Sequence, residues 1–92
     1  MAFTIYSDRA LVGQRFVALT ALEFKMLDVL MTHSGRIFTR DEIMDRIYRD
    51  FRIVNDRTID SHIKKLRRKL GTLGLEESPL RSVYGVGYKF EA

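Results

Sequence analysis

The sequence predicts a single α+β domain, with a small antiparallel sheet followed by three helices and a β-hairpin. Its 92 residues suffice for one hydrophobic core but not for two. β-Branched and aromatic residues occur in short runs near both ends of the chain, over residues 3–18 and 80–90. Between these regions, apolar residues recur at helical spacing. With 46% apolar and 30% charged residues, the composition is that of a folded domain.

Residues 3–18 predict the sheet. Their apolar runs are broken by Ser7-Asp8 and by Gly13-Gln14, which are typical turn residues. We therefore expect a short antiparallel meander.

The first helix is expected over about residues 20–33. Thr20 and Glu23 have the spacing of a capping box, and Ser34-Gly35 ends the pattern. Apolar residues cover more than half of the circumference of this helix, namely Leu22, Phe24, Met26, Leu27, Val29, Leu30 and Met31. Such a helix must be covered on two sides, so we expect it between the meander and the other helices.

A short extended link, residues 36–38, leads to the second helix. Thr39 and Glu42 repeat the capping-box spacing that marks its start. Its inward residues are predicted to be Ile43, Met44, Ile47 and Tyr48, and its outward residues Asp45, Arg46 and Arg49.

The third helix is expected over about residues 55–70, capped by Asn55 or Asp56 and ended by Gly71. It carries a narrow apolar stripe of Ile59, Ile63, Leu66 and Leu70. A polar connection follows. Residues 80–84 and 88–90 then form a hairpin around a Gly85-Val86-Gly87 turn.

Positive charge is concentrated on the third helix. Residues 57–69 carry six basic side chains and one acidic one, a net +5, while the whole chain carries only +4. The face opposite the apolar stripe centres on Arg57, Ser61, Lys64 and Arg68, with Lys65 beside it and Asp60 and Arg67 on the other flank. Like charges four residues apart destabilise an isolated helix, so an external polyanion is expected to compensate them. The major groove of B-DNA admits such a helix; the alternative is an ordinary solvated charged face.

Catalytic and metal sites are poorly supported, and no cofactor is expected. The chain has no Cys, and His33 and His62 lie on different helices without the spacing of a triad or a metal site. The glycine turn lacks the residues of a phosphate-binding loop. No apolar run reaches the roughly 18 residues that span a bilayer, so we expect a soluble protein without a membrane partner. We also expect it in the cytoplasm, and the absence of Cys permits such a reducing compartment.

A helix-loop-helix pair followed by a β-hairpin is the order of a winged helix-turn-helix, in which the hairpin reaches the DNA backbone or minor groove beside the recognition helix. Arg81, Ser82, Tyr84, Tyr88 and Lys89 supply polar or cationic groups for such a wing. Tyr88 can have two roles at once: its ring can be buried while its hydroxyl contacts a phosphate. The alternative is a ring that is only packed.

Three ordered motifs resemble the C-terminal effector domain of OmpR/PhoB-type bacterial response regulators. They are Leu19-Thr20 with Glu23-Phe24 and Leu27, then residues 57–70 (RTIDSHIKKLRRKL), then residues 83–90 (VYGVGYKF). The resemblance covers nearly the whole chain. It implies one winged-helix domain over residues 1–92, preceded by a four-stranded sheet. It also implies that the chain is a fragment of a regulator whose receiver domain, controlled by a sensor kinase, is absent.

The resemblance further implies binding of promoter DNA as tandem copies on repeated half-sites. The family's contacting positions fall on Arg57, His62, Lys64, Lys65, Arg67, Arg68, Ser82 and Tyr88. By its place at the edge of the core, His62 is suited to donate to a phosphate and not to read a base. The loop over residues 50–55, with Phe51 and Arg52, occupies the family's RNA polymerase contact; an unstructured connection is the alternative.

One position departs from the family pattern. Tyr84 stands where the family commonly has Arg, so it either packs or contacts sugar and phosphate. A different class of function also stays open, a winged-helix module that binds an acidic protein partner, because fold alone does not decide function.

Overall fold

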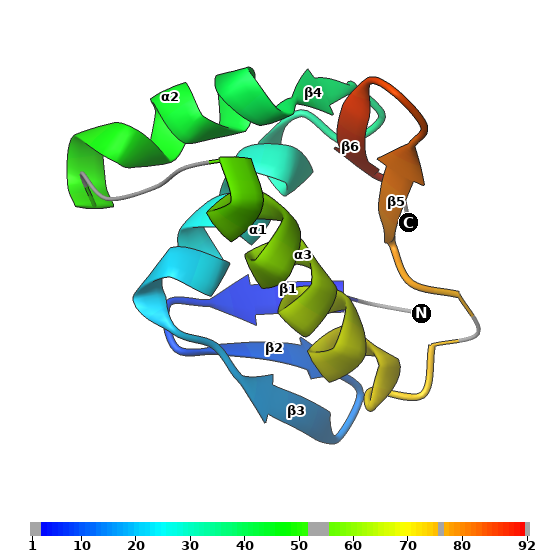
Figure 1. Cartoon of the computed structure of the whole chain (residues 1–92). Coiled ribbons are helices and arrows are strands. Elements are labelled where there is room, and N and C mark those ends of the chain that lie inside the picture. Colours follow the sequence, from blue (N-terminus) through cyan, green and yellow to red (C-terminus); the bar gives the residue numbers. More distant parts are fainter. Residues whose placement is uncertain (1–2, 52–55, 76, 92) are drawn as a thin grey trace.

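The computed structural model describes residues 3–51, 56–75 and 77–91, with side chains at all of these positions except 48, 50, 51 and 56–58. The described residues form three helices and six short strands (Figure 1). In chain order these are β1 (Phe3–Tyr6), β2 (Arg9–Val12), β3 (Arg15–Ala18), α1 (Ala21–Thr32), β4 (Phe38–Thr39), α2 (Arg40–Phe51), α3 (Asp56–Gly71), β5 (Leu80–Val83) and β6 (Gly87–Phe90). The predicted α+β class is confirmed.

The N-terminal sheet has three strands in the order β1-β2-β3 in the described part of the chain, so the expectation of four is wrong there. Two turns divide residues 3–18 into three strands of four residues each. The pairing is antiparallel, with Phe3 opposite Val12 and Val12 opposite Arg15. Residues 3–18 therefore consist of three strands and two turns.

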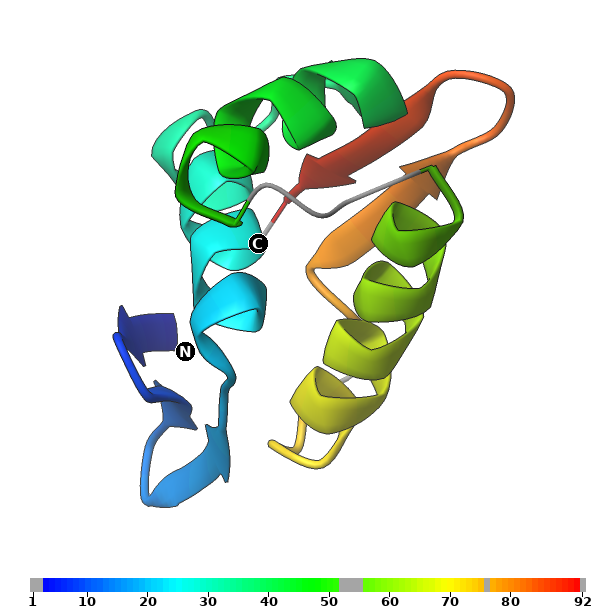
Figure 2. The ribbon, with the colours of Figure 1, turned by 60° about the vertical axis from the view of Figure 1, so that its left-hand side comes forward.

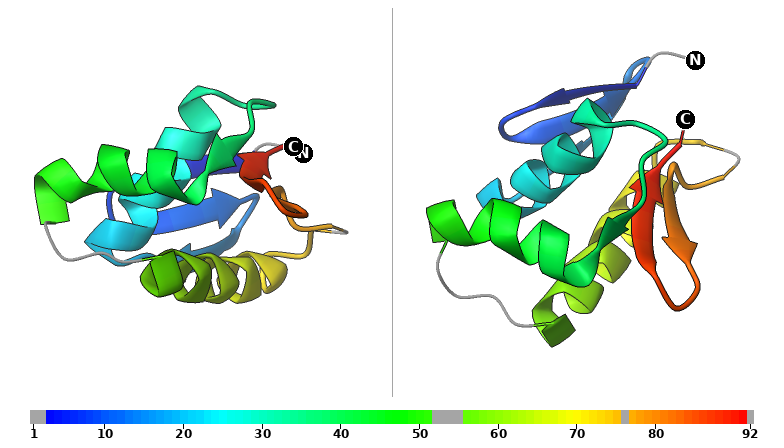
Figure 3. Two further views of the ribbon diagram at one scale, coloured as in Figure 1. Left: turned by 45° about the horizontal axis from the view of Figure 1, so that its top comes forward. Right: turned by 90° about the horizontal axis from the view of Figure 1, so that it is seen from above.

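The first helix lies between two layers, as predicted from its broad apolar surface. Figure 3 shows α1 with the N-terminal sheet on one side and α2 and α3 on the other. Met26, Leu27 and Leu30 are fully buried there. The capping box is formed: the Thr20 hydroxyl accepts from the Glu23 amide, and the Glu23 carboxylate accepts from the Thr20 amide.

A second sheet has the order β4-β6-β5 and joins the link before α2 to the hairpin. The expected extended link is present, but its pairing was not predicted: Phe38 lies opposite Tyr88 and Thr39 opposite Gly87. The backbones of β4 and β6 approach each other closely at Gly87, where an added Cβ would lie 1.9 Å from the Phe38 carbonyl oxygen. Position 87, in β6, therefore has no room for a side chain next to β4. The turn at residues 84–86 has Gly85 at φ 74°, a value that favours glycine.

The second helix confirms its predicted faces where its side chains are described. Ile43 and Ile47 are buried and Met44 is half-buried, whereas Asp45, Arg46 and Arg49 are exposed. Thr39 and Glu42 form the second capping box, with both hydrogen bonds at 3.1 Å. The predicted inward side chain of Tyr48 lies outside the described part.

The third helix turns its apolar stripe to the core, which confirms the orientation predicted from the sequence. Ile59, Leu66 and Leu70 have no exposed surface, and Ile63 has 1%. The helix includes Gly71 and ends one residue later than expected. Burial of this stripe leaves the opposite face of α3 to the solvent.

Candidate nucleic-acid interface

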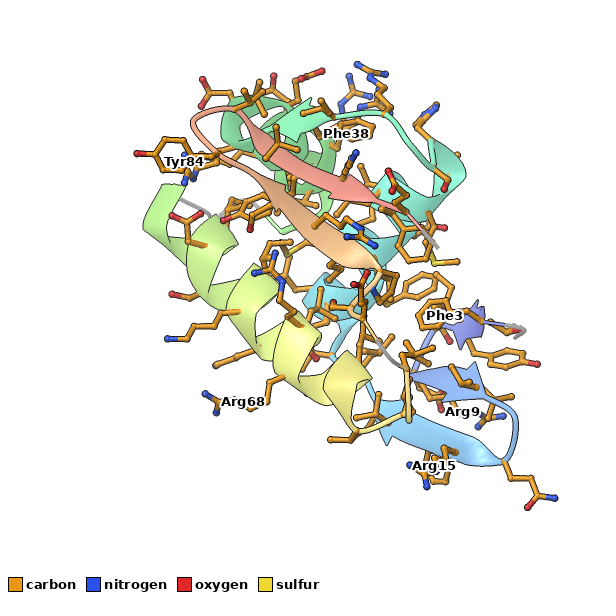
Figure 4. The ribbon with its side chains drawn as sticks, turned by 90° about the vertical axis from the view of Figure 1, so that its right-hand side faces the viewer. Phe3, Arg9, Arg15, Phe38, Arg68 and Tyr84 are labelled. Atoms are coloured by element: carbon orange, nitrogen blue, oxygen red, sulfur yellow. The ribbon has the colours of Figure 1, made fainter. Side chains whose placement is uncertain are left out.

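The outward face of α3 consists of exposed polar and cationic side chains. Ser61, Lys64, Lys65 and Arg68 are all exposed, and no described residue forms an ion pair or hydrogen bond with the three cationic ones. In Figure 4, Arg68 projects from α3 toward the side of the domain on which Tyr84 projects from the hairpin. Ser61, Lys64, Lys65 and Arg68 form one positively charged surface that is exposed to solvent and accessible to a ligand.

The side chains of three predicted contact residues are not described. Arg57 lies in the first turn of α3 and Phe51 in the last turn of α2, but their side chains are not described. Arg52 lies outside the described residues altogether. Their roles stay predictions.

Arg67 and Ser82, both predicted to contact DNA, are bonded to each other. The Arg67 guanidinium donates to the Ser82 hydroxyl at 2.7 Å and to the Leu80 carbonyl oxygen at 3.1 Å. Arg67 is half-buried by this arrangement. It fastens β5 of the hairpin, which we call the wing (residues 80–90), to the side of α3.

Tyr88 has the buried ring that was predicted, and its hydroxyl has a protein partner. The hydroxyl donates to the Asp60 carboxylate at 2.5 Å. The Arg40 guanidinium donates to the same carboxylate oxygen at 2.7 Å. Hydrogen bonds from Tyr88 and then Arg40 hold the pKa of Asp60 below its ordinary value, against a smaller effect of burial. Burial first, and then the bond to Asp60, raises the pKa of Tyr88, so the hydroxyl keeps its proton.

His62 is half-buried on α3, as its helical position near the edge of the core predicted. Burial lowers the pKa of His62, and the nearby charge of Lys65 lowers it further, while Glu23 opposes them. The imidazole is therefore neutral at pH 7. Its Nδ1 atom is buried without a hydrogen-bond partner among the described residues.

Tyr84 stands at the tip of the wing and is fully exposed. Val86 beside it is also exposed, and the turn residues 84–86 carry no charge. A depression of about 410 Å³ separates this tip from Arg40 at the start of α2, and its other lining residues belong to the wing. The wing thus presents the aromatic ring of Tyr84 at the position where the resemblance to the family led us to expect an arginine.

Lys69 is one of the six basic residues counted over residues 57–69, but its side chain is bonded to other elements of the domain. Its ammonium group donates to Glu23 at 2.5 Å and to the Ala18 carbonyl oxygen at 3.0 Å. Burial raises the pKa of Glu23, but hydrogen bonds from Lys69 and Thr20 outweigh it, and the net pKa is lowered. Lys69 therefore joins α3 to the start of α1 and does not belong to the outward surface.

The sequence pattern missed the supporting residues Arg40, Asp60, Glu23 and Lys69. A signal was present for two of them, because Asp60 and Lys69 lie roughly 90° from the centre of the apolar stripe on opposite flanks. Long polar side chains at such positions can fold back onto neighbouring elements. The partners, on α1 and α2, are distant in sequence and carry no matching pattern.

No group of three or more His, Asp or Glu residues in the described ranges is arranged to hold a metal ion. Nor is any described helix long and apolar enough to cross a bilayer.

The comparisons with known proteins agree on one family. Residues 13–90 match the family described as "Transcriptional regulatory protein, C terminal". The transcriptional regulatory protein BaeR of Escherichia coli O6:H1 is 50% identical over 78 residues, which are 85% of this chain and 32% of that protein. The chain thus spans about a third of the length of this relative.

Solved structures give the same result. The DNA-binding domain of the response regulator AdeR, in complex with an intercistronic region, has a TM-score of 0.80 at 30% identity, covering 97% of this chain and 93% of that one. The Klebsiella pneumoniae RstA DNA-binding domain, in complex with the RstA box, has a TM-score of 0.72 at 33% identity, covering 90% and 82%. These relatives share the fold of this chain, and the chain belongs to the C-terminal effector-domain family of OmpR/PhoB-type transcriptional regulatory proteins.

Proposed function

We propose that this domain binds double-stranded DNA in a sequence-specific manner as the output domain of a two-component response regulator. The observation that carries the proposal is the exposed face of α3, where Lys64, Lys65 and Arg68 have no anionic partner among the described residues. A helix that is apolar toward the core and cationic toward solvent fits the major groove. Promoter binding, tandem half-sites and a cytoplasmic location follow from this role.

The residues have different parts in the proposed complex. Ser61, Lys64 and Arg68, together with Arg57, face the bases, because they lie opposite the buried stripe. Lys65 lies beside that line and neutralises a phosphate, and the neutral His62 donates to one. The ring of Tyr84 contacts the backbone or minor groove from the wing. Arg67, Ser82 and Tyr88 are already bonded within the domain, and their main role is to hold the wing.

The full regulator supplies the remaining partners. A receiver domain and a sensor kinase would control the affinity for DNA, and the stretch that includes Phe51 and Arg52 would contact RNA polymerase. These proposals rest on the family alone.

Selection of bound duplexes from a random pool tests the proposal, because it reports specificity, half-site spacing and copy number together. We expect one enriched sequence, with log affinity falling against log salt at a slope of roughly −4 to −5 if four to six phosphates are neutralised. A pool without enrichment, together with binding to an acidic protein, would favour the protein-interaction alternative.

A matched pair of arginine variants tests whether DNA binds along the outward face of α3. Arg68→Ala removes a cation from the outward face of α3, and Arg9→Ala removes one from β2 of the N-terminal sheet; Figure 4 shows Arg9 on the sheet and Arg68 projecting from α3 on the other side of the domain. We expect Arg68→Ala to weaken binding and to reduce the salt slope by about 1, and Arg9→Ala to change neither. Equal losses in both variants would mean that the duplex does not bind along α3.

A further inference from the structure

The wing is held against α3 at two separate points. Figure 2 shows the hairpin running beside the helix. Arg67 bonds to β5 through Leu80 and Ser82. Nearer the start of α3, Asp60 accepts a hydrogen bond from Tyr88 of β6.

The second point joins three elements through one carboxylate. Arg40, at the start of α2, and Tyr88 donate to the same oxygen of Asp60, and the Arg40 guanidinium carbon lies 6.0 Å from the centre of the Tyr88 ring. Asp60 is ionised at neutral pH, since its pKa is lowered. The side chains of Asp60 and Arg40 are still 46% and 47% exposed, so the cluster lies at the surface, next to the cationic face.

A carboxylate at this position opposes the binding of a polyanion by simple electrostatics. Asp60 is four residues before Lys64 on the helix that we place in the groove, and a phosphate nearby would be repelled by it. Its presence is explained if its hydrogen bonds contribute more to binding than its charge costs.

We propose that Asp60 is a positioning residue that sets the wing at a fixed distance and angle to α3, so that both reach one duplex together. This inference rests on the proposed function. A wing that is ordered before binding loses less conformational entropy in the complex, and its contacts add to those of α3. Tyr88 then acts through Asp60 within the domain, and its hydroxyl is not a phosphate ligand.

Asp60→Ala distinguishes positioning from charge, because the two predict opposite signs. Loss of a negative charge alone would tighten DNA binding, and so would release of the Tyr88 hydroxyl toward a phosphate. Loss of positioning weakens binding, by about tenfold if the effect equals that of one charge-assisted hydrogen bond. Asp41→Ala is the matched control: Asp41 is an exposed acidic residue next to Arg40, without a bonded partner in the described ranges.

The footprint on the selected duplex gives a second measurement. In the Asp60→Ala complex we expect protection of guanine N7 in the major groove to persist and protection of the sugars under the wing to be lost. Tyr88→Phe should show the same loss, and the double variant no further loss, since both changes remove the hydrogen bond between Tyr88 and Asp60. Asp60→Asn keeps an acceptor for the hydroxyl and should recover part of the affinity.

The free domain provides a measurement that does not depend on DNA. Hydrogen exchange of the amides at residues 82–89 should be faster in Asp60→Ala than in the wild type, while the amides of α1 stay equally protected. Affinity that is unchanged or higher, an equal loss in Asp41→Ala, or unchanged exchange in the wing would each overturn the proposal. If the wild type selects no duplex, the proposed function fails, whereas the exchange experiment still decides the role of Asp60.

Discussion

Lys65 and Lys69 are four residues apart on α3, and the structure predicts opposite consequences for their loss. Lys69 bonds to Glu23, whose side chain is only 3% exposed, while the Lys69 side chain is 32% exposed. Lys65 is exposed on the outward face and has no bonded partner among the described residues. Substituting each by Met removes the charge and keeps most of the apolar stem.

The expected magnitude follows from burial. Removal of one partner of a fully buried ion pair costs about 3–5 kcal/mol, because the other charge is left unpaired. Since Lys69 is a third exposed, we expect Lys69→Met to lower the free energy of unfolding by about 2 kcal/mol, roughly 8–16 °C in Tm for a domain of this size. Lys65→Met should change it by less than about 0.5 kcal/mol.

Urea denaturation followed by circular dichroism measures the first effect, and DNA affinity against salt measures the second. Under conditions in which both variants are folded, Lys65→Met should reduce the salt slope by about 0.9, and Lys69→Met should leave it unchanged. The reasoning is refuted if Lys69→Met is as stable as the wild type, or if both variants lose the same slope.

Three further predictions concern other parts of the domain. The folded-state pKa of Glu23 is lowered, so the stability that Glu23 contributes is present above its ordinary pKa and is lost as the pH falls through the lower folded value; urea titrations from pH 7 to pH 3 should show a shallower loss in Glu23→Gln. Gly87→Ala places a Cβ against the Phe38 carbonyl, so we expect a loss of about 3 kcal/mol in thermal unfolding, and a wild-type Tm would contradict this contact. Tyr84→Ala should weaken DNA binding by about fivefold with an unchanged salt slope, and Tyr84→Phe should not; a changed slope would indicate a role in charge compensation.

The helices and the cationic surface could be predicted from the sequence because each depends on local spacing. Both capping boxes and the buried stripe of α3 appear where the pattern placed them. The same pattern separates Lys64, which is exposed, from Ile63, which is buried. Periodicity therefore identifies the face that is free to meet a ligand.

Contacts between distant segments could not be predicted in this way. The two residues of β4 are too few for a strand pattern, and their pairing depends on Gly87, almost fifty residues later. The charge count over residues 57–69 includes Lys69, but a count does not show that its long side chain folds back to Glu23 of α1 and to Ala18. The bonds of Arg67 and Asp60 to the wing likewise join residues that no local pattern connects.

The rings of Phe3 in β1 and Phe90 in β6 are in contact, with their centres 5.6 Å apart, so the first and last strands meet at one corner of the domain (Figure 3). A circularly permuted chain, with the old ends joined by a short flexible peptide and new ends opened at the exposed Gly74, should refold to the same tertiary structure.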